Sequence, residues 1–209
     1  MAKDIVEDTV DKLRLDSERL SRQLEFIIEI DKLKQILRQT VLVDKSRQEN
    51  DAEHSWHLAM MVMILKEYAP EGVRIDRAMK MVLVHDLVEI DAGDTFCYDE
   101  KANLDKRDRE LKAADRIFNI LPQDQAKELR DLWDEFEEGK TVDALFAIAM
   151  DRLQPLLHNH YTSGHTWAGK IRKDQVISRM SKVKEGAADL WLVVEEVVKE
   201  GLKRGYLKA

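Results

Sequence analysis

The segment VLVHDLVEIDAGD, residues 82–94, places five ionisable side chains among residues typical of a protein core. His85 and Asp86 are adjacent in its apolar part. Burying a polar group costs several kcal/mol unless a hydrogen bond or an ion compensates for the lost water. The pair is therefore either a hydrogen-bonded core histidine beside a helix-boundary aspartate, or part of a metal site.

Two further residues interrupt apolar segments in the same way. His54 begins the segment HSWHLAMM, and Asp151 follows FAIAM. Each has an ordinary structural explanation: packing for His54, and a salt bridge to Arg152 for Asp151. His57 lies one helical turn after His54, but the apolar residues that follow it favour packing over metal binding.

The four residues together combine two imidazoles with two carboxylates: His54, His85, Asp86 and Asp151. This ligand set suits a divalent transition ion, and mixed nitrogen and oxygen ligands permit octahedral coordination that leaves positions for water and substrate. Such an ion lowers the pKa of its bound water and polarises a phosphoryl oxygen. The pattern therefore predicts hydrolysis at a metal centre.

The order H…HD…D in a helical chain resembles that of the HD-domain metal-dependent phosphohydrolases. The surrounding residues resemble the branch that contains the bacterial 5′-deoxynucleotidases and their eukaryotic relatives. The resemblance covers roughly residues 24–180, and the matching residues are Arg38, Glu53–His54–Ser55, His85–Asp86–Leu87–Val88–Glu89, Gly93–Asp94 and Asp151. The resemblance implies a helical HD domain that binds one divalent ion and hydrolyses a phosphate ester.

The resemblance also implies roles for individual residues. The two histidines and two aspartates above match the metal ligands, and Glu89 matches the acid that orients or deprotonates the attacking water. Glu89 lies four residues after His85 and shares its helical face, and a nearby cation lowers the pKa of a carboxyl group. Arg38 matches an arginine that grips the phosphate, for which a guanidinium is well suited. Asp94 matches a contact to the sugar hydroxyl.

Three of these residues have structural alternatives. Glu89 also fits a salt-bridge partner, Arg38 a basic residue at a helix C-terminus, and Asp94 an Asx-type turn. One position departs from the family pattern, because Gln39 follows Arg38 where the deoxynucleotidases carry a bulky Trp that excludes a ribose 2′-hydroxyl. The resemblance therefore leaves the choice between ribose and deoxyribose open.

The segment LLHNHYTSGHTW, residues 156–167, offers polar side chains beyond Asp151. We expect His158 and Asn159 to form a cavity wall that helps to bind the substrate. Lys101 and Lys106 are weaker candidates for phosphate contacts, since exposed lysines are common.

Apolar spacing indicates helices along nearly the whole chain. Only 8 Gly and 3 Pro are present, which favours helices with short connections. We predict one all-α domain over residues 1–209, a helical bundle of seven to nine helices. Asp51 and Asp76 are expected to cap two of them, Gly139 to end one, and Thr141 to cap the next, which Pro155 would kink or divide. The expected helices span 17–37, 52–69, 76–90, 106–121, 123–138, 142–161, 173–183 and 186–203.

Charge and cysteine content argue against a nucleic-acid-binding protein and for an intracellular one. The net charge is −7, with 34 basic and 41 acidic side chains, which matches nucleic-acid polymers poorly. The single cysteine, Cys97, the lack of a signal-peptide core in MAKDIVEDTV and the lack of a membrane-length apolar run indicate a cytoplasmic protein. The apolar face of the helix at 186–203 predicts internal packing or a homodimer interface.

The leading hypothesis is a metal-dependent phosphomonoester hydrolase that removes the 5′-phosphate from a nucleoside or deoxynucleoside monophosphate. The ion would be Mn, Co, Fe, Ni, Zn or Mg. One alternative keeps the metal site with another phosphorylated nucleotide, such as a deoxynucleoside triphosphate, a cyclic nucleotide or a guanosine polyphosphate. A second alternative is a regulatory module that binds a metal or nucleotide without turnover.

Overall fold

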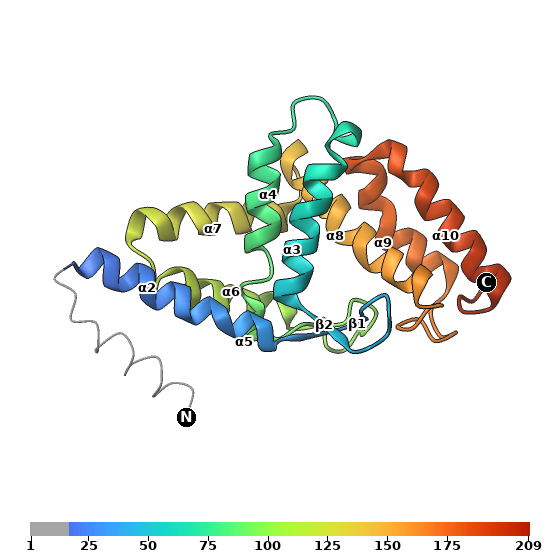
Figure 1. The fold of residues 1–209 in the computed structure, drawn as a ribbon, viewed down its shortest axis with the longest axis horizontal. Helices are drawn as coiled ribbons and strands as arrows, with labels where there is room; N and C mark the ends of the chain where they lie inside the picture. The colour runs from blue at the N-terminus through green and yellow to red at the C-terminus, as the bar shows by residue number, and fades with distance from the viewer. Residues whose placement is uncertain (1–16) are drawn as a thin grey trace.

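The computed structural model describes residues 17–209, and these fold mainly into α-helices (Figure 1). The expectation of an all-α chain is confirmed, apart from a small hairpin of two strands. The N-terminal segment MAKDIVEDTV lies outside the described residues. The elements are α2 (Glu18–Ile30), η1 (Asp31–Gln35), β1 (Leu37–Val41), β2 (Gln48–Asn50), α3 (Asp51–Ile64), η2 (Lys66–Tyr68), α4 (Ile75–Val84), α5 (Glu89–Ala92), α6 (Lys106–Phe118), α7 (Gln123–Glu138), α8 (Val142–Tyr161), α9 (Lys173–Gly186), η3 (Ala188–Leu190) and α10 (Trp191–Arg204).

Helix α8 is the central element of the bundle. It contacts α3, α4, α7, α9 and α10, so residues on nearly all of its faces are buried. Pro155 does not divide it, because α8 continues to Tyr161. Proline lacks the N–H that would bond the carbonyl four residues earlier, here that of Asp151. Packing of α8 on several sides outweighs this local cost.

The apolar core has two parts. The larger lies between α3, α4, α8, α9 and α10 and contains Leu58, Val82 and Phe146. The smaller lies beneath α6 and α7 and contains Phe118 and Trp133. Full burial of a side chain of this size contributes about 1.5–3 kcal/mol, so the larger cluster holds α3, α4 and α8 in fixed relative positions, and the smaller one packs α6 and α7 against the end of α4.

The β1–β2 hairpin replaces the last part of the helix expected over residues 17–37. The strands pair antiparallel, with Leu37 opposite Asn50 and Val41 opposite Gln48. Helical spacing of leucines continues to Leu37, but β-branched residues follow it, and these favour extended backbone. Arg38 therefore lies on a strand, not at a helix C-terminus.

Several helix boundaries also differ from expectation. Asn50, not Asp51, caps α3: its side chain accepts from the Glu53 N–H while the Glu53 carboxylate accepts from the Asn50 N–H. Asp76 lies in the first turn of α4 and does not cap it. The predicted roles of Gly139 and Thr141 are confirmed, since Gly139 is left-handed at the end of α7 and Thr141 caps α8.

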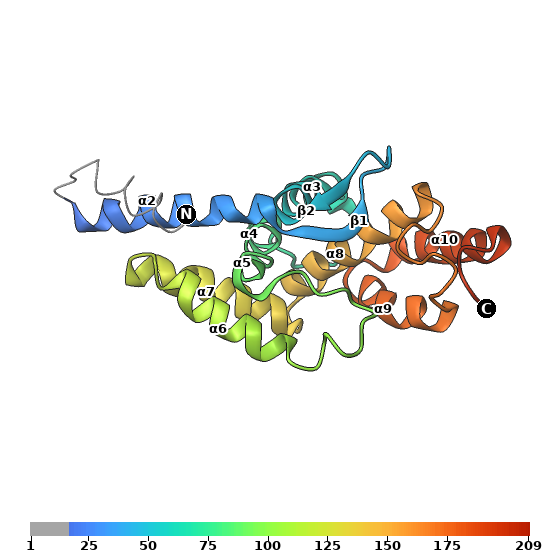
Figure 2. The same ribbon diagram turned by 90° about the horizontal axis from the view of Figure 1, so that it is seen from below.

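The helix expected over 76–90 ends early. Helix α4 stops at Val84, His85 occupies its C-cap position, and a short helix α5 begins at Glu89. The predicted loop over 92–104 is present and runs towards α9 before it returns to α6 (Figure 2). Within residues 17–209, no helix combines the length and apolarity that crossing a membrane requires.

Candidate metal centre

The four predicted metal ligands converge on one point inside the bundle. His54 comes from α3, His85 and Asp86 from the turn after α4, and Asp151 from α8. Nε2 of His54 lies 3.0 Å from Oδ1 of Asp151 and 3.9 Å from Oδ2 of Asp86. Nε2 of His85 lies 3.1 Å from Oδ1 of Asp86 and 3.7 Å from Oδ1 of Asp151. All four side chains are buried.

His85 and Asp86 lie at the C-terminal end of α4. His85 keeps helical backbone angles at the C-cap, with φ −58° and ψ −40°, and its N–H bonds the carbonyl of Met81, while Asp86 follows in the turn before α5. Nδ1 of His85 donates to the carbonyl of Val82 at 2.9 Å, which leaves the lone pair of Nε2 facing the site. A histidine held in this way is oriented for metal binding.

The unpaired atoms at this point fit a divalent cation. Nε2 of His85 is buried and has no hydrogen-bond partner, although two carboxylates lie near it. A lone pair that faces carboxylate oxygens is repelled unless a cation or a proton lies between them. Burial lowers the pKa of His85, but Asp86 and Asp151 outweigh that effect and raise it to about 10. The site thus attracts positive charge strongly.

Glu89, the predicted water-activating acid, lies beside the ligands at the start of α5. It is buried, and its Oε2 has no partner. Burial raises its pKa well above the ordinary value, and repulsion from Asp86, Asp51 and Asp94 adds to the shift. A cation at the ligands would favour the ionised form instead.

Arg38 lies against the metal ligands and neutralises part of their charge. Its Nη1 donates to Oδ2 of Asp86 at 2.9 Å and to Oδ1 of Asp51 at 3.1 Å. Asp51 is fully buried, and the sequence assigned it only a capping role. Burial and the charge of Asp86 raise its pKa to about 7. The sequence held one signal for this position of Asp51. Asn50 is a strong N-cap residue, so Asp51 was not needed as the cap and could pair with Arg38 instead.

A cavity of about 410 Å³ opens beside the ligands. Its lining includes Arg38, Gln39, Glu89, Asp94, Lys106, Arg152, Asn159 and Arg179. Sequence reasoning missed the cation Arg179. It named Arg152 only as a salt-bridge partner of Asp151, and the structure contains that pair, with Nη1 of Arg152 2.6 Å from Oδ2 of Asp151. Arg179 lies on α9, and only the packing of α9 against α8 brings it here.

His158 and Asn159 have different surroundings. Asn159 lines the cavity, and its amide oxygen accepts from the backbone N–H and the hydroxyl of Thr166. Among the described residues, His158 is not part of the lining. Its ring instead lies near His57, with 5.7 Å between ring centroids. The site therefore brings together the predicted ligands, Glu89, Arg38, Asp94 and Asn159, while His158 lies behind it.

Comparison with known proteins identifies relatives of much of the chain. The chain is similar to the human 5′-deoxynucleotidase HDDC2, with 31% identity over 135 residues, 64% of this chain and 65% of the human one. It thus spans 65% of the length of that relative. The HDDC2 protein of Dictyostelium discoideum is 35% identical over 162 residues, 73% of this chain and 85% of its own.

A solved structure shares the fold closely. It is described as a predicted metal-dependent phosphohydrolase from Magnetospirillum magnetotacticum, with 52% identity and a TM-score of 0.88 over 91% of this chain and 96% of the other. A family model described as HD domain matches residues 30–191. That match spans well over half of the sequence and contains all four converging histidines and aspartates, so the chain belongs to the HD domain family.

Proposed function

We propose that this protein is a metal-dependent phosphomonoester hydrolase that removes the 5′-phosphate from nucleoside and deoxynucleoside monophosphates. The observation that carries the proposal is the convergence of two imidazoles and two carboxylates at a cavity that also holds Glu89 and Arg38. The names of the HDDC2 relatives support the same reaction class.

Each residue has a defined task in this reaction. His54, His85, Asp86 and Asp151 would hold the ion, which when bound would acidify a water molecule and polarise a phosphoryl oxygen. The Glu89 carboxylate accepts the proton of the attacking water. Attack on phosphorus breaks the P–O bond to the 5′-oxygen, and the proton that Glu89 took from the water passes to this oxygen, so that it leaves as the nucleoside hydroxyl and Glu89 is ionised again.

Cations in the cavity stabilise the charge that develops on phosphorus. Arg38 donates to phosphoryl oxygens while it stays close to Asp86. Arg179 adds positive charge to the wall, whereas Arg152 is paired there with Asp151, its Nη1 lying 2.6 Å from Oδ2. Preorganised donors of this kind stabilise the transition state more than the substrate.

The size and charge of the cavity favour a monophosphate. A volume of about 410 Å³ lies within the range of about 300–1,000 Å³ common for small-molecule sites. Lys106 and Arg107 are paired with Glu110 and Glu137, so they add little free positive charge. A triphosphate would need more unpaired cations than this wall provides.

Gln39 in the cavity wall bears on which sugar the site accepts. A flexible glutamine leaves room beside the sugar that a bulky Trp would fill. We propose that both ribonucleotides and deoxyribonucleotides are substrates, with Asp94 accepting a hydrogen bond from a sugar hydroxyl.

We propose that the protein acts in the cytoplasm as a homodimer. The single cysteine supports a reducing compartment. The apolar face of α10 packs largely inside the protein, with Val194, Val197 and Val198 buried. Helix α3 instead presents Trp56 and Ile64 to solvent, 64% and 67% exposed. Light scattering after size exclusion tests the dimer, and Trp56→Ser should weaken it.

Phosphate release provides the test of the activity. The purified protein is assayed with ribonucleoside and deoxyribonucleoside mono-, di- and triphosphates in the presence of Mn, Co, Fe, Ni, Zn or Mg. Glu89→Gln should remove most activity and still bind metal, whereas Asp91→Asn, on the same short helix, should remain active. Metal-loaded protein that releases no phosphate from any monophosphate would overturn the proposal and favour a binding module.

A further inference from the structure

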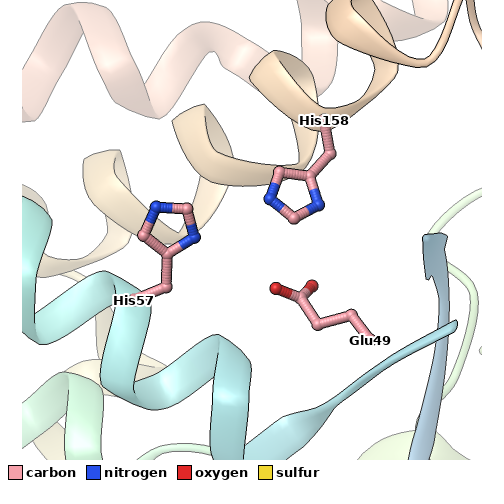
Figure 3. A group of neighbouring side chains, drawn as sticks. All are labelled: Glu49, His57 and His158. Atoms are coloured by element: carbon pink, nitrogen blue, oxygen red, sulfur yellow. The ribbon is translucent and has the colours of Figure 1, made fainter. Parts of the chain in front are cut away.

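A second group of metal-binding side chains lies behind the candidate metal centre. Glu49 of β2, His57 of α3 and His158 of α8 point towards one another (Figure 3). Each contributes one ligand atom, and these atoms all lie within 4.8 Å of each other. Within residues 17–209, none of the three lines the cavity of the first site.

Gln154 shows that this group has too many hydrogen-bond acceptors. Its Nε2 lies 2.6 Å from Oε1 of Glu49, 3.3 Å from Nδ1 of His57 and 3.1 Å from Nε2 of His158. An amide nitrogen carries only two hydrogens, so one of the three acceptors receives none. Gln154 is fully buried, and an unsatisfied acceptor there is costly.

The ring of His158 is oriented with a bare nitrogen towards the group, and His57 favours the neutral form. Nδ1 of His158 donates to the carbonyl of Val41 at 3.1 Å, so its Nε2 carries a lone pair in the neutral ring. Burial and the neighbouring His158 lower the pKa of His57, which favours its neutral form. Neutral imidazoles are the form that binds metal ions.

We propose that Glu49, His57 and His158 form a second site for a divalent transition ion of the Zn²⁺ class. Two histidines and one glutamate are a ligand set found at zinc sites, with a fourth position available to another group. Rotation of the Gln154 amide by half a turn would supply that group, because its Oε1 is buried and unpaired. The oxygen and nitrogen of such an amide are assigned from their hydrogen bonds, and a bound cation reverses the assignment.

The second site would fasten the β1–β2 hairpin to the bundle. Glu49 lies on β2, whereas His57 and Gln154 lie on α3 and α8. Oε2 of Glu49 is 3.8 Å from Nε of Arg38 and 3.8 Å from Nδ1 of His54. An ion held by Glu49 therefore fixes the strand pair that carries Arg38, and the two metal sites share the Glu49 carboxylate as a neighbour.

Metal counting tests this proposal without measuring activity. The full chain is stripped with a chelator, dialysed against Zn²⁺ or Co²⁺, and analysed for ions per chain. Wild type should hold two ions. His57→Gln and Asp86→Asn should each hold one, and the double variant none. His160→Gln, which changes a histidine of α8 outside the group, should keep two.

Circular dichroism establishes that each variant is folded. The Co²⁺ spectrum provides a second measurement, because a four-coordinate ion absorbs differently from a six-coordinate one, which is the geometry expected for an ion at the first site. The four-coordinate component should disappear in His57→Gln and persist in Asp86→Asn. The proposal is overturned if wild type holds only one ion, or if His57→Gln holds as many ions as wild type.

Discussion

Replacement of Arg38 by Met should destabilise the protein, since Arg38 is the cation closest to several buried acids. Its Nη1 donates to Asp86 and Asp51, and its Nε lies 3.8 Å from Oε2 of Glu49. These three carboxylates are at most 7% exposed. Met preserves the length and apolar contacts of the side chain but removes the charge.

The magnitude follows from the burial of the acids. Removal of one partner from a buried ion pair costs about 3–5 kcal/mol, because the remaining charge stays uncompensated. For a domain of this size, each kcal/mol shifts Tm by about 2–4 °C. We therefore expect Arg38→Met to lower Tm by about 6–20 °C in metal-free protein at pH 7.

Arg38→Lys separates charge from geometry. Lysine keeps the positive charge but loses the planar pair of donors, so the loss of stability should be smaller. Loss of one charge-assisted hydrogen bond to the phosphoryl group costs about 1.5–3 kcal/mol. That corresponds to a decrease of about 10–150-fold in kcat/KM.

Calorimetry of chelator-treated protein measures the stability, since bound metal would stabilise the folded state by mass action. Arg47→Met is the matched control: Arg47 follows β1 and pairs with Glu53, but its side chain is 53% exposed. An exposed pair contributes about 0–1 kcal/mol, so its Tm should change little. Equal Tm values for Arg38→Met and Arg47→Met would refute the assignment of Arg38 as the counter-charge of the buried acids.

Three further predictions concern the ion, the sugar and the packing. Asp86→Asn should bind the metal ion at least tenfold more weakly, as measured by calorimetric titration. Mutation of residues that only hydrogen-bond to metal ligands already costs about 10–100-fold in affinity. Gln39→Trp should raise the ratio of kcat/KM for deoxyribonucleotides over ribonucleotides about tenfold, because a ring fills space beside the sugar; an unchanged ratio would place Gln39 away from the sugar. Gly186→Ala should cost about 1–3 kcal/mol in urea unfolding, because the added Cβ would lie 2.0 Å from the carbonyl oxygen of Leu145.

The residues of the candidate metal centre could be predicted as a group because they stand out locally. His54, His85, Asp86 and Asp151 each interrupt an apolar segment, and a buried polar group needs a partner wherever the segment lies. Asp51 was harder to find, because a charged residue in the first turn of a helix is ordinary and its burial depends on the hairpin above it.

Other parts of the structure depend on contacts between distant segments, which a local sequence pattern does not predict. Arg38 was predicted as a phosphate ligand, but its strand was missed because leucine spacing continued the helical pattern through Leu37. His57 was assigned to packing, which agrees with its half-buried position on α3, yet its ring faces His158 from a distant part of the chain. Only the folded bundle brings Glu49 and Gln154 between them.

The concentration of acids links metal binding to folding. Asp51, Asp86, Glu89 and Asp151 are all buried within one region, where Arg38 provides a single guanidinium for the first two. In the unfolded chain these carboxylates are solvated, and folding brings them together against their mutual repulsion. The apolar contacts of α3, α4 and α8 offset part of that cost, and an ion bound only by the folded state offsets more. Chelation should therefore lower Tm by more in wild type than in Asp86→Asn. The variant has lost one ligand of the ion, so removal of the ion takes less stability from it.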